Sequence, residues 1–163
     1  MDRLWAPWRL DYITGEKIEG CIFCVFPQLD EDRKHHILYR GKYAYIIMNA
    51  FPYSNGHLLV PPYRHIADIN DLTPEESLEI MQLTQMCSSA LKAICRPDGF
   101  NIGINMGTAA GAGIADHLHL HIVPRWNGDT NFMPVFADVK VIPEALETTY
   151  DKLKIEFDKL TDL

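Results

Sequence analysis

Apolar and aromatic residues recur along this chain in short runs that predict β-strands. Residues 36–40 and 44–49 are rich in β-branched and aromatic side chains, and Gly41 and Lys42 between them favour a hairpin. Turn-forming residues then lead into a third strand at 57–61. The first third of the chain is therefore expected to supply three neighbouring strands.

Two longer segments have the spacing of amphipathic helices. The first runs from residue 74 to about residue 95, where Thr73 is a good N-cap, Pro74 suits the first helical position and Glu76 completes a capping box. The second is predicted to begin near Pro143. Each has an apolar stripe for a core, formed by Ile80, Leu83, Cys87, Leu91 and Ile94 in the first helix and by Leu146, Tyr150, Leu153, Phe157 and Leu160 in the second.

Two further strands are predicted between these helices. They occupy residues 100–106 and 118–124, and a loop of small residues at 107–113 separates them. Strands that follow one another, interrupted by one long helix and closed by another, are typical of an α+β domain. We therefore expect an antiparallel β-sheet of about five strands with one long helix and a C-terminal helix.

Length and composition indicate one ordinary globular domain. The 163 residues are 47% hydrophobic and 23% charged, and no apolar stretch approaches the ~20 residues that span a bilayer. The N-terminus lacks the apolar segment and cleavage site of a signal peptide, so we expect a cytoplasmic protein. We expect an N-terminal arm at 1–20, with a docking segment or short helix at 4–13, a core at 21–126 and a C-terminal extension at 127–163.

The charge balance restricts the partners. Fifteen basic residues against twenty-two acidic ones give a net charge of -7, which disfavours binding to DNA or RNA. A small anion remains compatible with this charge, because a pocket needs only a few aimed donors.

Three histidines at period two are the strongest chemical signal. On a strand, His117, His119 and His121 would share one face, while the apolar residues between them face the core. One such histidine would be read as a structural residue. Three stacked imidazoles cost desolvation and repel one another when protonated, so an anion or a metal is the expected partner.

The preceding loop could contribute to an anion site. Its glycines at 107, 111 and 113 permit positive φ and let backbone N–H groups approach a phosphate, although an ordinary turn explains them equally well. The loop lacks the Gly-Lys-Ser/Thr ending of a P-loop.

Two motifs resemble a known family. Residues 117–123, HLHLHIV, are similar to the signature of the histidine triad (HIT) superfamily, and residues 55–61, NGHLLVP, resemble the strand before its active site. The resemblance covers about residues 20–126 and implies a HIT-like fold. The N-terminal LWAPWR and residues 125–132 further resemble the branch that contains bacterial diadenosine tetraphosphate phosphorylases.

The resemblance implies a two-step nucleotidyl transfer. His119 would attack the α-phosphorus of a nucleotide and form a nucleotidyl-imidazole, and His121 would donate to a phosphate oxygen. Asn49 matches the ribose-binding position, and Asn105 is the expected polar contact to phosphate. The remaining nucleotide-binding residues implied are Ala112, Gly113 and Ile114 in the loop, Ile22, Phe23 and Met48 as walls around the base, and Trp126.

Cys21 and Cys24 form a Cys-x-x-Cys pair that suits zinc but could also be redox-active or inert. The resemblance implies that His65 and His117 complete a structural zinc site with them. His35 and His36 are rival ligands with less support and are interpreted as surface residues.

The acceptor in the second step separates two enzymatic interpretations. Many hydrolases of the superfamily have a glutamine where this chain has Gly113, and the missing side chain leaves space for orthophosphate, with Trp126 as a wall. We therefore expect phosphorolysis of diadenosine tetraphosphate to ADP and ATP. The alternatives are a hydrolase of dinucleoside polyphosphates or nucleoside phosphoramidates that releases AMP, and a non-catalytic, zinc-stapled nucleotide-binding module. By resemblance, the chain is expected to be a homodimer.

Overall fold

Five antiparallel strands form one sheet in the computed structural model, which describes residues 19–129 and 142–161. Their order is β1-β2-β3-β5-β4, so the strand that carries the end of the histidine triad lies between β3 and β4. The expected α+β fold is confirmed. The strands are β1 (Ile37–Arg40), β2 (Tyr45–Met48), β3 (Leu58–Val60), β4 (Gly99–Ile104) and β5 (Leu120–Arg125).

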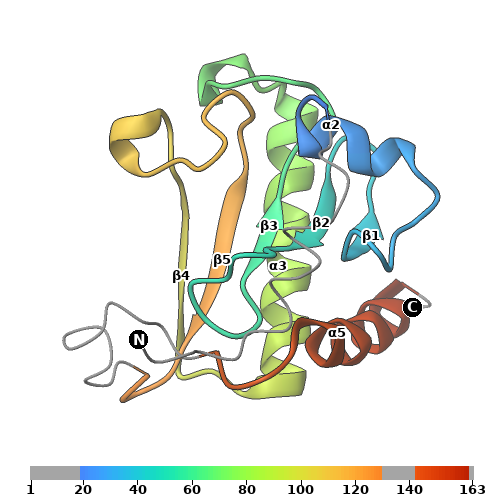
Figure 1. Cartoon of the computed structure of the whole chain (residues 1–163), viewed down its shortest axis with the longest axis vertical. Coiled ribbons are helices and arrows are strands. Elements are labelled where there is room, and N and C mark those ends of the chain that lie inside the picture. The colour runs from blue at the N-terminus through green and yellow to red at the C-terminus, as the bar shows by residue number, and fades with distance from the viewer. Residues whose placement is uncertain (1–18, 130–141, 162–163) are drawn as a thin grey trace, which may run out of the picture.

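The long helix α3 (Pro74–Cys95) begins and ends where the sequence predicts. Thr73 and Glu76 form the expected capping box, and Arg96 ends the helix in the left-handed conformation. α3 lies along one face of the sheet, and α5 (Leu146–Thr161) packs beside it near β1 (Figure 1). No described helix combines the length and apolar character needed to cross a membrane.

Short helical segments surround the other end of the sheet. α2 (Ile22–Val25) continues into η1 (Phe26–Gln28), η2 (Ile69–Asp71) precedes α3, and η3 (Thr108–Ala110) lies in the loop between β4 and β5. In Figure 1, α2 and the η3 loop lie at the end of the sheet opposite α5. This end receives the triad, because Leu120, at the start of β5, pairs there with Ile104 at the end of β4.

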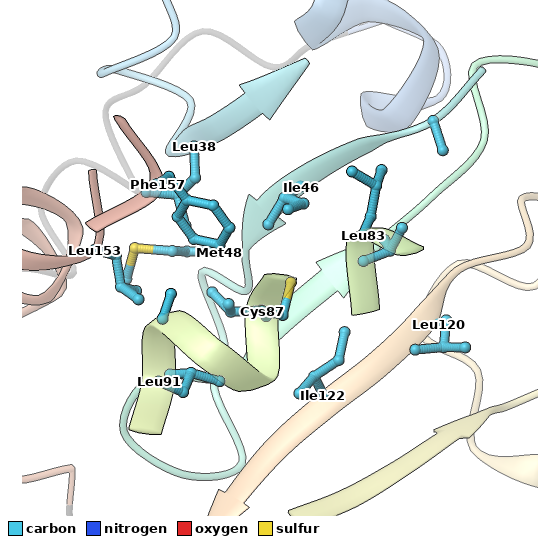
Figure 2. Packing of buried hydrophobic residues seen from close by; sticks show 14 of the residues in the cluster. Leu38, Ile46, Met48, Leu83, Cys87, Leu91, Leu120, Ile122, Leu153 and Phe157 are labelled. Atoms are coloured by element: carbon cyan, nitrogen blue, oxygen red, sulfur yellow. The ribbon is translucent and has the colours of Figure 1, made fainter. Parts of the chain in front are cut away.

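The main core fills the space between the sheet and the two long helices. Strand β2 contributes Ile46 and Met48 to it, whereas Tyr45 and Ile47 point to the other face. In Figure 2, Met48 lies close to Leu153 of α5. The second apolar cluster, on the face without α3, joins α2 to the sheet through Phe23, Ile37, Tyr45, Ile47 and Leu59.

Two boundaries differ notably from the predicted ones. β5 begins at Leu120, so His117 and His119 precede the strand, and only His121 belongs to the ladder. The last helix begins at Leu146 rather than near Pro143, because the first bond of helical spacing runs from the N–H of Thr149 to the carbonyl oxygen of Ala145 at 3.1 Å. The predicted arm at 4–13 and part of the segment 125–132 lie outside the described residues.

Candidate active site and metal site

The three triad histidines share one face of the extended chain, as predicted. Their exposed fractions are 0% for His117, 5% for His119 and 8% for His121. The rings of His119 and His121 are 4.7 Å apart, and Phe23 of α2 lies 5.3 Å from His117 and 4.9 Å from His119. The intervening Leu120 points instead into the core beneath α3. The histidines thus form a row between the sheet and α2.

His119 is held in one orientation by the main chain. Its Nδ1 lies 2.8 Å from the carbonyl oxygen of His117. A carbonyl only accepts, so Nδ1 carries the proton and Nε2 keeps a lone pair. Burial lowers the pKa of His119, and the ring is therefore neutral at neutral pH. A neutral imidazole with a bare Nε2 has the form of a nucleophile.

His121 has an unsatisfied ring nitrogen. Its Nδ1 lies 3.0 Å from Nε2 of His57, while its Nε2 is the buried side-chain polar atom that lacks a partner among the described residues. Burial, followed by the neighbouring His119, lowers the pKa of His121 to about 4. A buried polar atom without a partner is costly, which makes this nitrogen a candidate contact for a ligand oxygen.

His57 is a site residue that the sequence analysis missed. It is buried, and its Nδ1 lies 3.2 Å from Nδ2 of Asn49 and 3.1 Å from the backbone N of Tyr53. The alternation of side chains along the third strand could have identified it. Leu59 pairs with His121 and lies on the triad face, and a residue two positions earlier points to the same side.

The four predicted zinc ligands converge on one point, and their ligand atoms all lie within 4.8 Å of one another. Nδ1 of His117 is 3.3 Å from Sγ of Cys21, 3.5 Å from Sγ of Cys24 and 3.2 Å from Nδ1 of His65. Tetrahedral zinc with ordinary bond lengths would separate such nitrogen and sulfur atoms by about 3.3 to 3.8 Å. The donor set and its spacing therefore fit zinc.

The hydrogen bond at the far side of the His117 ring supports the same assignment. Nε2 of His117 lies 2.9 Å from the carbonyl oxygen of Pro62, so it carries the proton and donates. Nδ1 is then left with a lone pair directed at the two sulfurs. Ligating histidines are commonly held by such a backbone contact.

Other predicted nucleotide contacts lie around this row. Asn105 follows β4, and the register that pairs Ile104 with Leu120 places it across from His119. Ile22 and Ile114 pack against the apolar cluster around Phe23. The loop through Ala112 is partly exposed, and a Cβ added at Gly113 would meet open space. Positive φ is found at Gly107 and Gly111, as expected.

Two predicted roles disagree with the structure. Met48 faces the core below α3, because strand alternation turns it away from the triad, so it does not wall a base pocket. Trp126 follows the far end of β5, and its Nε1 donates to the carbonyl oxygen of Cys95 at 3.1 Å, so within one chain it packs against the end of α3.

His35 and His36 are excluded from the metal cluster, as the sequence analysis favoured, but they are not simple surface residues. The His35 ring stacks on Phe26 at 4.1 Å, and Nε2 of His36 lies 2.9 Å from a carboxylate oxygen of Glu147. Both rings are largely covered.

Comparison with known proteins adds a family match. The model of the HIT domain matches residues 31–128. The AP-4-A phosphorylase of Mycobacterium tuberculosis is 40% identical over 166 residues, which cover 96% of this chain and 85% of that protein. The bis(5'-adenosyl)-triphosphatase of Saccharomyces cerevisiae is 34% identical over 91 residues, covering 55% of this chain and 44% of that protein.

A solved structure has a similar fold. The Zn-bound histidine triad family protein from Mycobacterium smegmatis superimposes with a TM-score of 0.70 at 28% sequence identity. The match covers 88% of this chain and 96% of that one.

Proposed function

Because this chain belongs to the histidine triad (HIT) family, whose members acting on dinucleoside polyphosphates include its 40% identical relative, we propose that it is a nucleotidyl transferase that uses His119 as its nucleophile. The observation that most directly supports this role is the contact between Nδ1 of His119 and the carbonyl of His117, which leaves Nε2 with a lone pair. We further propose that the substrate is diadenosine tetraphosphate.

In the first step, Nε2 of His119 forms a bond to the α-phosphorus, and the bond from that phosphorus to the bridging oxygen breaks. ATP departs with the bonding electron pair, and AMP remains attached to the imidazole. His121 donates from Nε2 to a non-bridging oxygen, where negative charge develops in the transition state. This nitrogen is buried and has no partner among the described residues, which supports that role.

In the second step, an oxygen of orthophosphate attacks the AMP phosphorus and the bond to Nε2 breaks, which yields ADP and restores the neutral imidazole. The open space beside Gly113 supports an acceptor larger than water. The name of the mycobacterial relative supports the same acceptor. Water as acceptor would instead release AMP.

Cys21, Cys24, His65 and His117 would hold the zinc ion. When bound, zinc would cross-link α2 to the start of the triad segment and offer no free coordination position, since four protein ligands complete its sphere. Its contribution to the reaction would be the placement of the chain at 117–119.

We also propose that the protein is a homodimer. Among the described residues, strand β4 is an edge of the sheet, and its Ile102 is 50% exposed on the face that carries α3. Met81 and Leu78 of α3 are exposed as well. An unpaired edge with apolar side chains favours association with a second copy, which light scattering on a sizing column would measure.

The test is a product assay on the zinc-loaded protein. Diadenosine tetraphosphate is incubated with and without orthophosphate, and the nucleotides are separated. We expect ADP and ATP in equal amounts, only when phosphate is present, and no products from His119→Ala. AMP and ATP without phosphate would assign the protein to the hydrolases, and tight substrate binding by wild type without turnover would make it a binding module.

A further inference from the structure

We infer that His57 is a positioning residue that fixes the tautomer of His121, so that His121 presents an N–H, and not a lone pair, to the phosphate. This inference deepens the proposed function and rests on it for the identity of the ligand. The chain of contacts begins at a backbone amide on the loop between β2 and β3 and ends at the unpaired nitrogen of His121.

The first link is the backbone N–H of Tyr53, whose nitrogen lies 3.1 Å from Nδ1 of His57. An amide N–H only donates, so Nδ1 of His57 accepts and carries no proton. Asn49 agrees with this assignment. Its Oδ1 accepts from the backbone N–H of Phe51 at 2.9 Å, which leaves its NH₂ group to donate to the same Nδ1 at 3.2 Å.

The second link crosses from β3 to β5. With Nδ1 bare, the proton of His57 must be on Nε2, and the doubly protonated ring is excluded because its Nδ1–H would face the Tyr53 N–H. Nε2 of His57 lies 3.0 Å from Nδ1 of His121, and both rings are buried. His57 therefore donates, and Nδ1 of His121 accepts.

The third link is the result at the site. A neutral His121 that accepts at Nδ1 carries its only proton on Nε2, the buried atom without a partner. The ring of Tyr53 lies 5.7 Å from that of His121, at an interplanar angle of 12°, and the ring of His57 is 4.7 Å from that of Tyr53. These ring contacts restrain both imidazoles.

The two adjacent triad histidines therefore have opposite tautomers, each set by one backbone group. The carbonyl of His117 puts the proton of His119 on Nδ1 and frees Nε2 to attack. The amide of Tyr53, acting through His57, puts the proton of His121 on Nε2, where it can donate. Without His57, nothing described here would select between the two neutral forms of His121.

The direct measurement is a long-range ¹H–¹⁵N spectrum of the zinc-loaded protein at pH 7, with His121 assigned by comparison with His121→Asn. We expect the wild-type spectrum to show protonation of His121 at Nε2. In His57→Leu, the signals of His121 should move toward a mixture of both tautomers. His57→Gln keeps a side-chain N–H near the position of Nε2 and should restore the wild-type pattern in part.

Kinetics on diadenosine tetraphosphate give the second readout. Loss of a donor from the transition state predicts that kcat falls ~10- to 100-fold in His57→Leu with a smaller change in KM, and that His57→Gln recovers part of it. A wild-type spectrum with the proton on Nδ1 of His121 overturns the inference even if the variants do not fold, and so does an unchanged spectrum in folded His57→Leu. The wild type could instead give the expected spectra and turn over no dinucleotide. That result would support the tautomer assignment and reject only the proposed function.

Discussion

His117 connects the metal cluster to His119 through two different parts of one residue. Its Nδ1 lies among Cys21, Cys24 and His65, while its backbone carbonyl oxygen lies 2.8 Å from Nδ1 of His119. The candidate metal ligand and the carbonyl that orients the proposed nucleophile therefore belong to the same residue. A metal held by this cluster would therefore support the placement of His119 without contacting the phosphate.

Loss of a sulfur ligand should therefore lower stability and activity together. We expect wild type to bind about one zinc per chain, and Cys24→Ser to lose most of it and to unfold at lower temperature. Elemental analysis and thermal unfolding measure both. The buried Cys87 is the matched control, because it lies in the core and outside the cluster, so Cys87→Ala should retain zinc. Full zinc content in Cys24→Ser would contradict the assigned ligand set.

Burial of His121 predicts an acid-sensitive fold. Its pKa is about 4 in the folded protein against 6.5 for the unperturbed side chain, so between these values the unfolded chain binds more protons. Stability from this group is present above pH 6.5 and is lost as the pH falls toward 4. From pH 7 to pH 5, wild type should lose about 2 kcal/mol more than His121→Asn.

Urea unfolding of the two zinc-loaded proteins at both pH values measures this difference. Asparagine keeps an acceptor near the position of Nδ1 but does not titrate, so the comparison removes the contribution of the other histidines. Parallel losses in the two proteins would show that His121 is not held neutral by the fold.

Glu79 should contribute more to the free energy of unfolding than its neighbours on α3 do. Its carboxylate accepts from the backbone N–H groups of Lys42, Tyr43 and Ala44 in the turn between β1 and β2. Removal of an acceptor shared by three N–H groups predicts a loss of about 3 kcal/mol for Glu79→Ala. Glu75→Ala, on the exposed first turn of the same helix, should change the free energy of unfolding by less than about 0.5 kcal/mol. Similar losses of unfolding free energy in both variants would show that the contacts of Glu79 with the β1–β2 turn add no special stability.

Gly113 should control the choice of acceptor. A Cβ added there meets no atom within 4 Å, so Gly113→Gln is expected to fold normally and to place an amide in the open space. We expect phosphorolysis to fall roughly 10-fold or more, because a misplaced acceptor loses the benefit of alignment. The ratio of ADP to AMP measures the outcome, with Gly113→Ala as the size control. An unchanged product ratio and an unchanged rate in Gly113→Gln would show that the acceptor does not bind in the space beside residue 113.

Local patterns in the sequence predicted most of the elements because each depends on neighbours along the chain. Thr73, Pro74 and Glu76 determine the start of α3 by themselves, and the period of the triad places its three rings on one face. The metal ligands were also identified, although only the family resemblance joined His65 and His117 to the two cysteines.

The errors concern contacts between distant parts of the chain. The face on which Met48 lies depends on the pairing of β2 with β3, and the position of Trp126 depends on where β5 ends relative to α3. His57 was missed for the same reason, since its partner His121 belongs to a strand that follows after the whole of α3. Sequence alone predicts which residues of a strand share a face, but not which face meets the site or which residue of another strand lies beside them.

The position of β5 between β3 and β4 also affects how the protein folds. The pairing of Leu59 with His121 closes a long loop that contains α3, and such long-range pairings form slowly compared with local helices and hairpins. We therefore expect the three imidazoles to come together only when β5 enters the sheet. A folding intermediate that precedes this step would contain α3 and the β1–β2 hairpin but would have no catalytic activity. Recovery of turnover during refolding should therefore lag behind recovery of the helical circular dichroism signal.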